Sequence, residues 1–131
     1  MITQPTDARA VLARAAQIIA LHGLHHGDYV VDPFNRASRS PHYLRPMSAV
    51  GALNCAVTRD PRTPSNLAWQ ALRLLAEVVL VDSEPAWSAN IEDCERHVEA
   101  WSDASSDTHV VHTMRLLAGE KARRALTAVA A

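Results

Sequence analysis

The sequence predicts a mainly α-helical protein, a compact bundle of about five helices with a short β-hairpin or an extended loop between the first two. Apolar residues recur three and four positions apart along most of the chain, which is the spacing of one helix face. Helix start signals precede four of these stretches, and a single short run, Tyr29-Val30-Val31, favours a strand. The 131 residues fall within the size of one domain, so we expect residues 1–131 to form a single domain.

The first helix is expected to begin at Thr6-Asp7, a capping hydroxyl followed by a first-turn acid, and to end at Gly23. After the strand-like run, residues 34–46 are rich in Arg, Ser, Pro and Asn, which predicts a long loop. Residues 47–58 are small and apolar enough to form a buried second helix. The apolar stripe of the first helix consists of Ala8, Val11, Leu12, Ala15, Ile18 and Ile19.

Three further helices complete the expected bundle. Thr63-Pro64 marks the start of the third, because proline is tolerated at the first helical position. This helix is the most hydrophobic in the chain, so we expect it to be central. Asn90 caps the fourth, and Ser106-Asp107 opens the fifth. The fifth is expected to carry on one side Val110, Val111, Met114, Leu117, Lys121, Ala125 and Leu126.

Composition narrows the classes of function. A net charge of −1 gives no basic surface for nucleic acid, so we expect no nucleic-acid partner. No run reaches the roughly 18 apolar residues of a membrane helix. The N-terminus lacks the basic and apolar regions of a signal peptide, so we expect a cytoplasmic protein without a membrane partner. Cys55 and Cys94 are expected to be small buried hydrophobes rather than a disulfide or a nucleophile.

Several short motifs resemble a family of small actinobacterial and phage proteins, the domain of unknown function number 6197. They are a Gly-x-Tyr element at Gly27–Tyr29, a small-residue helix at Ser48–Leu53 and a Trp-x-Asp turn at Trp101–Asp103, after which Thr108 leads into a final apolar helix. The resemblance runs from the first helix to about Ala118. The chain departs from the family pattern at Ser48, where cysteine is common, at Ser102, where asparagine is common, and at 109–111, where an acid is common. The resemblance implies no activity.

The sequence predicts neither a metal nor a nucleotide cofactor. His109 and His112 have the spacing of two ligands on one helix face, but both point away from the apolar stripe of the fifth helix. We therefore expect them to face solvent. The chain has no His-Glu-x-x-His or Cys-x-x-Cys motif and no glycine-rich phosphate loop.

General acid–base chemistry remains, because it needs only positioned titratable groups with pKa values near the working pH. Seven histidines supply candidates. Each candidate also has a structural interpretation, as a wet helix end, a rim side chain or a turn residue. The predicted catalytic residues are His25, His26, Asp28 and Tyr29, and the predicted substrate-binding residues are His42, Tyr43, Arg45, Trp101 and Asp103.

Two functions of different classes are compatible with these residues. The first is a small biosynthetic enzyme of lyase or cyclase type that acts without a cofactor on a small organic substrate, by dehydration, conjugate addition or cyclisation. The second is a non-catalytic interaction module, a homodimer or a binder of another protein, that uses the loop 34–46. An apolar cavity lined by His25, His26 or His42 would favour the enzyme, whereas a filled core and a flat apolar patch would favour the module.

Overall fold

The computed structural model describes residues 7–25, 46–86 and 88–130, of which 120–130 are described by the course of their helix alone. Five helices lie in these residues: α1 (Ala8–His22), α2 (Ala49–Thr58), α3 (Asn66–Val78), α4 (Ile91–Asp103) and α5 (Asp107–Ala130). The described residues contain no strand, only isolated β-bridges. The predicted all-α bundle is confirmed. The loop or hairpin predicted between the first two helices falls on residues outside this description.

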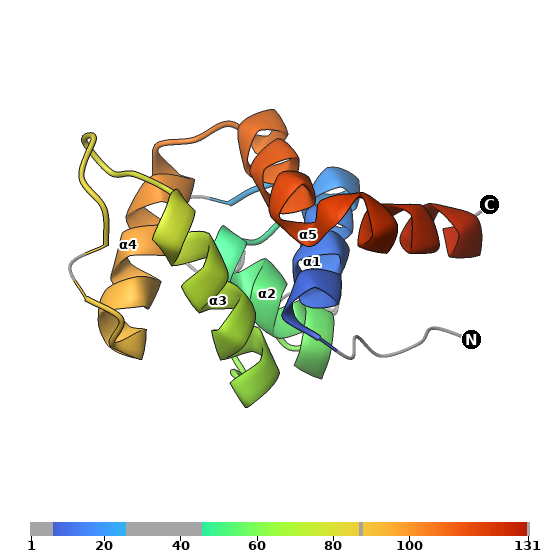
Figure 1. The fold of residues 1–131 in the computed structure, drawn as a ribbon, viewed down its shortest axis with the longest axis horizontal. Coiled ribbons are helices and arrows are strands. Elements are labelled where there is room, and N and C mark those ends of the chain that lie inside the picture. The colour runs from blue at the N-terminus through green and yellow to red at the C-terminus, as the bar shows by residue number, and fades with distance from the viewer. Residues whose placement is uncertain (1–6, 26–45, 87, 131) are drawn as a thin grey trace, which may run out of the picture.

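Helix α3 lies in the middle of the bundle and packs against α1, α2, α4 and α5 (Figure 1). The third helix thus contacts each of the other four, but the most enclosed helix is α2, in which Ala49–Ala56 are all buried. Helix α5 runs along α1, and all five helices contribute buried side chains to one core. The largest of these side chains are Leu12, Ile19, Met47, Leu53, Leu72, Leu75 and Met114.

Polar caps set where the helices begin, and four of them lie on α1 to α4. Asp7 accepts the Ala10 N–H at 2.8 Å, so Asp7 itself caps α1 and is not a first-turn acid as the sequence predicted. Asn90 caps α4 as predicted, through the Glu92 N–H. The other two caps are Ser48 for α2 and Ser65 for α3.

Helix α3 begins two residues later than the Thr63-Pro64 signal suggests. The Thr63 hydroxyl donates to the Asp60 carboxylate at 2.7 Å, and the Thr63 N–H donates to the Asp60 carbonyl at 3.0 Å. These bonds hold Thr63 in the preceding turn. Ser65 then accepts the Ala68 N–H and starts the helix.

Gly119 interrupts α5 with φ 80° and ψ 158°, a conformation that glycine adopts without a side-chain clash. Arg9 of α1 donates to the Leu117 carbonyl at 3.5 Å, next to this break. The single regular face predicted as far as Leu126 is therefore wrong, because the helix changes direction after Ala118 (Figure 1). In the part of the chain that the structure describes, no helix combines the length and apolarity needed to span a membrane.

The chain ends that flank residues 26–45 lie side by side. The His25 N–H donates to the Met47 carbonyl at 3.0 Å, and the Met47 N–H donates to the Gly23 carbonyl at 3.3 Å. The Leu24 N–H donates to the Asp107 carboxylate at 3.3 Å. The exit from α1 and the entry to α2 are thereby joined to the first turn of α5.

Candidate functional site

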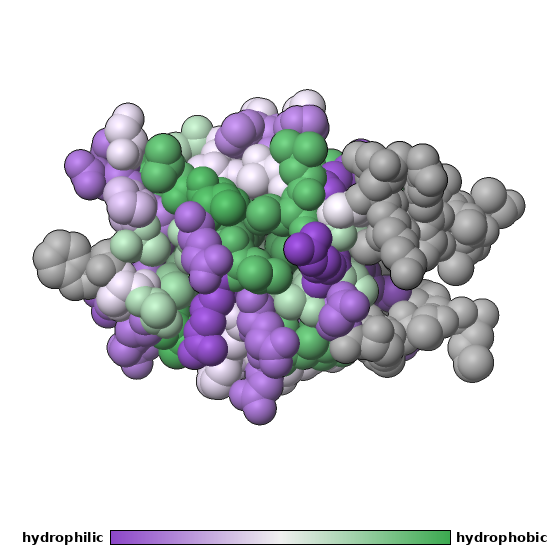
Figure 2. Space-filling model, in the orientation of Figure 1, coloured by the Kyte–Doolittle hydropathy of each residue, from purple (hydrophilic) through white to green (hydrophobic). Residues whose placement is uncertain are grey.

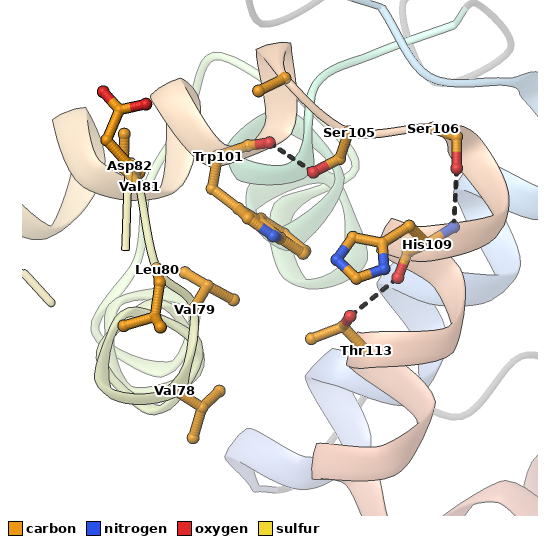
Figure 3. Close-up of a pocket in the computed structure, with 11 residues that line it drawn as sticks. Val78, Val79, Leu80, Val81, Asp82, Trp101, Ser105, Ser106, His109 and Thr113 are labelled. Atoms are coloured by element: carbon orange, nitrogen blue, oxygen red, sulfur yellow. Dashed lines mark hydrogen bonds between the residues drawn. The ribbon is translucent and has the colours of Figure 1, made fainter. Parts of the chain in front are cut away.

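An open groove of about 650 Å³ lies between the end of α3 and the α4–α5 junction (Figure 3). One wall is the chain that leaves α3, the other is the first two turns of α5, and the end of α4 lies between them. The residues that line it are Val78, Val79, Leu80, Val81, Asp82, Trp101, Ala104, Ser105, Ser106, His109 and Thr113.

Hydrogen bonds hold the first wall in place. His97 of α4 lies with its Nε2 2.7 Å from the Val79 carbonyl, which fixes the end of α3 against α4. Val81 and Glu84 then exchange two backbone hydrogen bonds around a tight turn, hereafter the hairpin turn (Val81–Glu84). Its central residues, Asp82 and Ser83, have φ values of 51° and 65°, as two-residue turns of this kind require. The chain leaves α3 at Val79, whose backbone is extended, and the hairpin turn reverses its direction after Val81.

The α4–α5 junction provides the base of the groove and the second wall. Trp101, in the last turn of α4, is only 5% exposed. The Ser105 hydroxyl donates to the Trp101 carbonyl at 2.6 Å. Ser106 then accepts the His109 N–H through its hydroxyl and the Val110 N–H through its carbonyl, and so starts α5.

His109 faces the groove and contacts its base. The imidazole and the Trp101 indole lie edge to face, with ring centroids 5.8 Å apart and planes at 60°. Figure 3 shows the imidazole on the α5 wall, opposite Val79 and Leu80. No described residue forms a hydrogen bond with its ring nitrogens, so both are available to a molecule bound in the groove.

The other polar side chains of the groove either form hydrogen bonds with the protein backbone or point away from His109. The Ser105 hydroxyl donates to the Trp101 carbonyl of α4, and the Thr113 hydroxyl donates to the His109 carbonyl within α5. The Asp82 carboxylate lies on the opposite wall from His109 and points away from it (Figure 3). In the part of the chain that the structure describes, the groove therefore offers apolar walls, an aromatic base and one imidazole, with no carboxylate placed to orient that imidazole.

The structure describes three of the predicted site residues and does not bring them together in one site. Trp101 lies at the base of the groove, and Asp103 is exposed in the last turn of α4. His25 is half-buried at the junction of the two loop ends and does not line the groove. The predicted residues outside the described part of the chain are His26, Asp28, Tyr29, His42, Tyr43 and Arg45.

Sequence reasoning missed most of the groove. No role was predicted for the run 78–81, although the Asp82-Ser83 pair after it is a turn signal. His109 was assigned to solvent because of its position on the helix. His109 is exposed, as predicted, but its imidazole lies over the indole of Trp101. The sequence placed Trp101 on the fourth helix without showing which residues of other helices it contacts.

A second polar cluster lies where α4 meets the start of α2. Glu99 accepts the Val50 N–H at 3.3 Å, and Ser102 accepts the Ala49 N–H at 3.2 Å. Burial raises the pKa of Glu99, against the lowering effect of its hydrogen bonds to Ser48 and Val50. These side chains accept hydrogen bonds from backbone N–H groups in the first turn of α2 and so join α2 to α4. The cluster therefore has a structural role.

Both thiols are buried, as predicted, and neither belongs to the groove. Burial raises the pKa of Cys55 to about 11 and also raises the pKa of Cys94. A thiol with a raised pKa is a poor nucleophile at neutral pH. Among the described residues, no group of three His, Cys, Asp or Glu side chains is arranged to hold a metal ion.

Comparison with known proteins gives a family but no activity. No curated protein and no solved structure matches the chain. A family model described as a family of unknown function, DUF6197, matches residues 3–120, which include every groove-lining residue. The resemblance seen in the short motifs is thereby confirmed, and the chain belongs to the DUF6197 family of unknown function.

Proposed function

We propose that this protein is a non-catalytic interaction module whose groove binds an apolar segment of a protein. The observation that supports this is the exposure of large apolar side chains along both walls. Val78 and Leu80 are 51% and 53% exposed on the α3 side, and Leu116 of α5 is 63% exposed. Leu116 follows His109 by seven residues and Thr113 by three, so helical spacing places it on the groove side of α5.

Figure 2 shows that the apolar surface runs from α3 across to α5. We call Val78, Leu80 and Leu116, with the groove between them, the apolar face. Contiguous exposed apolar surface with a polar rim is typical of interaction sites rather than of inert protein surface.

The free energy available at this face suits transient binding. Complete burial of a valine or leucine side chain contributes roughly 1.5–3 kcal/mol, so the exposed half or more of these three residues contributes about 1 kcal/mol each. A micromolar complex requires about 8 kcal/mol. A partner must therefore also fill the groove above Trp101, or cover surface beyond it, to bind tightly.

Site-specific photo-crosslinking in the source cells tests the proposal. A benzophenone amino acid at position 80 should give a discrete covalent adduct with a protein. Leu21 is the matched control, since it is 71% exposed and does not line the groove. No adduct from position 80, or the same adducts from positions 80 and 21, would contradict the proposal.

One observation favours a second candidate function, an acid–base enzyme of the lyase or cyclase type. The His109 imidazole faces an apolar groove beside an indole and has no hydrogen-bond partner among the described residues. A substrate seated over Trp101 would then exchange its proton with His109. In this proposal His109 takes the role for which the sequence had suggested His25 and His26.

Metabolite profiling separates this candidate from the module. Wild-type protein added to an extract of the source cells should deplete one metabolite, and His109→Gln should slow that depletion by roughly 10²-fold or more, the usual contribution of a positioned acid or base. His112→Gln is the control, because this exposed histidine lies on the same helix but does not line the groove. No depletion by the wild type would eliminate the enzyme.

A further inference from the structure

We infer that Asp82 is a site of backbone modification, at which the backbone nitrogen of Ser83 attacks the Asp82 side chain and converts the residue to isoaspartate. This inference is independent of the proposed function. Both residues are exposed in the hairpin turn, and the Asp82 carboxylate points away from the groove (Figure 3).

The reaction needs only water. The Ser83 nitrogen forms a bond to the Asp82 Cγ and loses its proton, while the protonated carboxyl group releases a water molecule, which leaves a five-membered succinimide ring. Attack of water at Cγ breaks the new bond and restores aspartate. Attack of water at the main-chain carbonyl carbon breaks the original peptide bond instead. The main chain then runs through Cβ and Cγ, and the residue is isoaspartate.

Both reacting groups of this pair are free of other bonds. Among the residues that the structure describes, none donates a hydrogen bond to the Asp82 carboxylate and none accepts the Ser83 N–H. The backbone hydrogen bonds of the hairpin turn join Val81 and Glu84, which flank the pair. Closure of the succinimide ring therefore breaks no hydrogen bond of the fold.

The five other aspartates that the structure describes lack this freedom. The N–H groups that follow Asp93 and Asp103 donate to helix carbonyls, and Asp60 precedes a proline, which has no N–H. The carboxylates of Asp7 and Asp107 each accept the backbone N–H of another residue. The structure thus favours Asp82 over the others.

The backbone conformation of the turn also suits the ring. Asp82 and Ser83 both have positive φ, whereas a second kind of two-residue hairpin turn has positive φ at its first central residue alone. A succinimide at the first position fixes the rotation about its Cα–C bond as in this second kind. Rotation of the single peptide between Asp82 and Ser83 converts one turn into the other. It also moves Ser83 out of the left-handed region, which is unfavourable for a residue with a Cβ.

The modification would alter one wall of the groove. Isoaspartate lengthens the main chain of the turn by one atom, so the paired hydrogen bonds between Val81 and Glu84 cannot both be kept. Val81 and Asp82 both line the groove. The α3 side of the groove would therefore change its shape as the protein ages.

Peptide mapping by mass spectrometry, after prolonged incubation of the folded protein in mildly acidic buffer, tests the inference. Isoaspartate should form at Asp82 roughly tenfold or more faster than at Asp103, because the hydrogen bonds of the Ala104 N–H must break before Asp103 can react. Asp82→Glu would require a larger ring and should give no product at position 82. Asp103→Glu is the matched control and should leave the rate at Asp82 unchanged.

The same incubation in urea separates the effect of the fold from that of the sequence. Serine and alanine after an aspartate give different rates by themselves, and only this difference remains in the unfolded chain. The ratio of the rate at Asp82 to the rate at Asp103 should therefore be several times larger in the folded protein than in urea. Equal ratios, or no isoaspartate at Asp82 in the folded protein, would overturn the inference.

Discussion

The buried carboxyl group of Glu99 predicts the direction in which the stability of the protein changes with pH. Burial is the main cause of its raised pKa, and the nearby Asp103 and Glu95 carboxylates raise it further, while hydrogen bonds from Ser48 and Val50 lower it. Because the folded-state pKa exceeds the unfolded value, the contribution of Glu99 to stability is fully present below the unfolded pKa. It is lost as pH rises through the folded pKa. We expect Glu99→Gln, which keeps an oxygen acceptor for Val50, to become more stable relative to the wild type as pH rises through the acidic range.

Urea unfolding of both proteins at a series of pH values measures this difference. Glu77→Gln is the control, because it makes the same chemical change at an exposed position. If the Glu99→Gln difference does not change with pH, or if it has the opposite slope, then the capping hydrogen bonds outweigh burial at this carboxyl group.

Cys55 gives a chemical prediction at the same scale. Its side chain is 4% exposed, and burial, with a smaller contribution from Asp60, raises its pKa to about 11. Since the thiolate is the reactive form, we expect Ellman's reagent to label neither thiol of the folded protein at neutral pH. Both should be labelled in urea. Rapid labelling of one thiol without denaturant would show that the packing around it opens.

At the scale of the helices, the sequence predicted those helix ends that depend on residues close together in the chain. Asn90 and Gly23 were identified because a capping side chain and a C-terminal glycine act within one turn of the backbone. The start of α3 was misplaced because the Thr63 side chain bonds to Asp60, which competes with its role as a cap. The break at Gly119 was missed because an isolated glycine in a helical pattern has several outcomes, and the neighbouring helix decides among them.

The groove could not be predicted in the same way. It brings together the hairpin turn, the last turn of α4 and the first turns of α5, which are distant in the sequence. Periodicity shows which face of each helix is apolar, but not how far two helices diverge at their ends. Trp101 was therefore recognised as a candidate on its own helix, whereas its neighbour His109 was not placed beside it.

Helix α3 carries the stability prediction at this scale. Leu75 is 0% exposed on the face that packs against the rest of the bundle. Leu75→Ala should lower the free energy of unfolding by roughly 2–5 kcal/mol, the range for removing a large buried side chain. Gln70→Ala, at an exposed position of the same helix, should change it by less than about 0.5 kcal/mol. If urea titration shows a loss below about 1 kcal/mol for Leu75→Ala, the core around α3 is packed differently from the structure described above.

At the scale of the whole molecule, the five helices share one core, and α3 touches each of the other four. Removing any one helix would expose buried residues of α3, so no part of the bundle keeps its packing when another part unfolds. We therefore expect a single cooperative unfolding transition, as is usual for small domains.

Two probes that report on different elements test this cooperativity. Circular dichroism at 222 nm follows all helices. In a background that carries both Trp69→Phe and Trp87→Phe, tryptophan fluorescence follows Trp101 alone, at the base of the groove. The two signals should have the same urea midpoint in the wild-type core, and Leu75→Ala should move both by the same amount. A fluorescence midpoint well below that of the circular dichroism signal would instead mean that the α4–α5 junction opens first. The groove would then be only loosely connected to the core, and it would not provide the rigid surface on which both proposed functions depend.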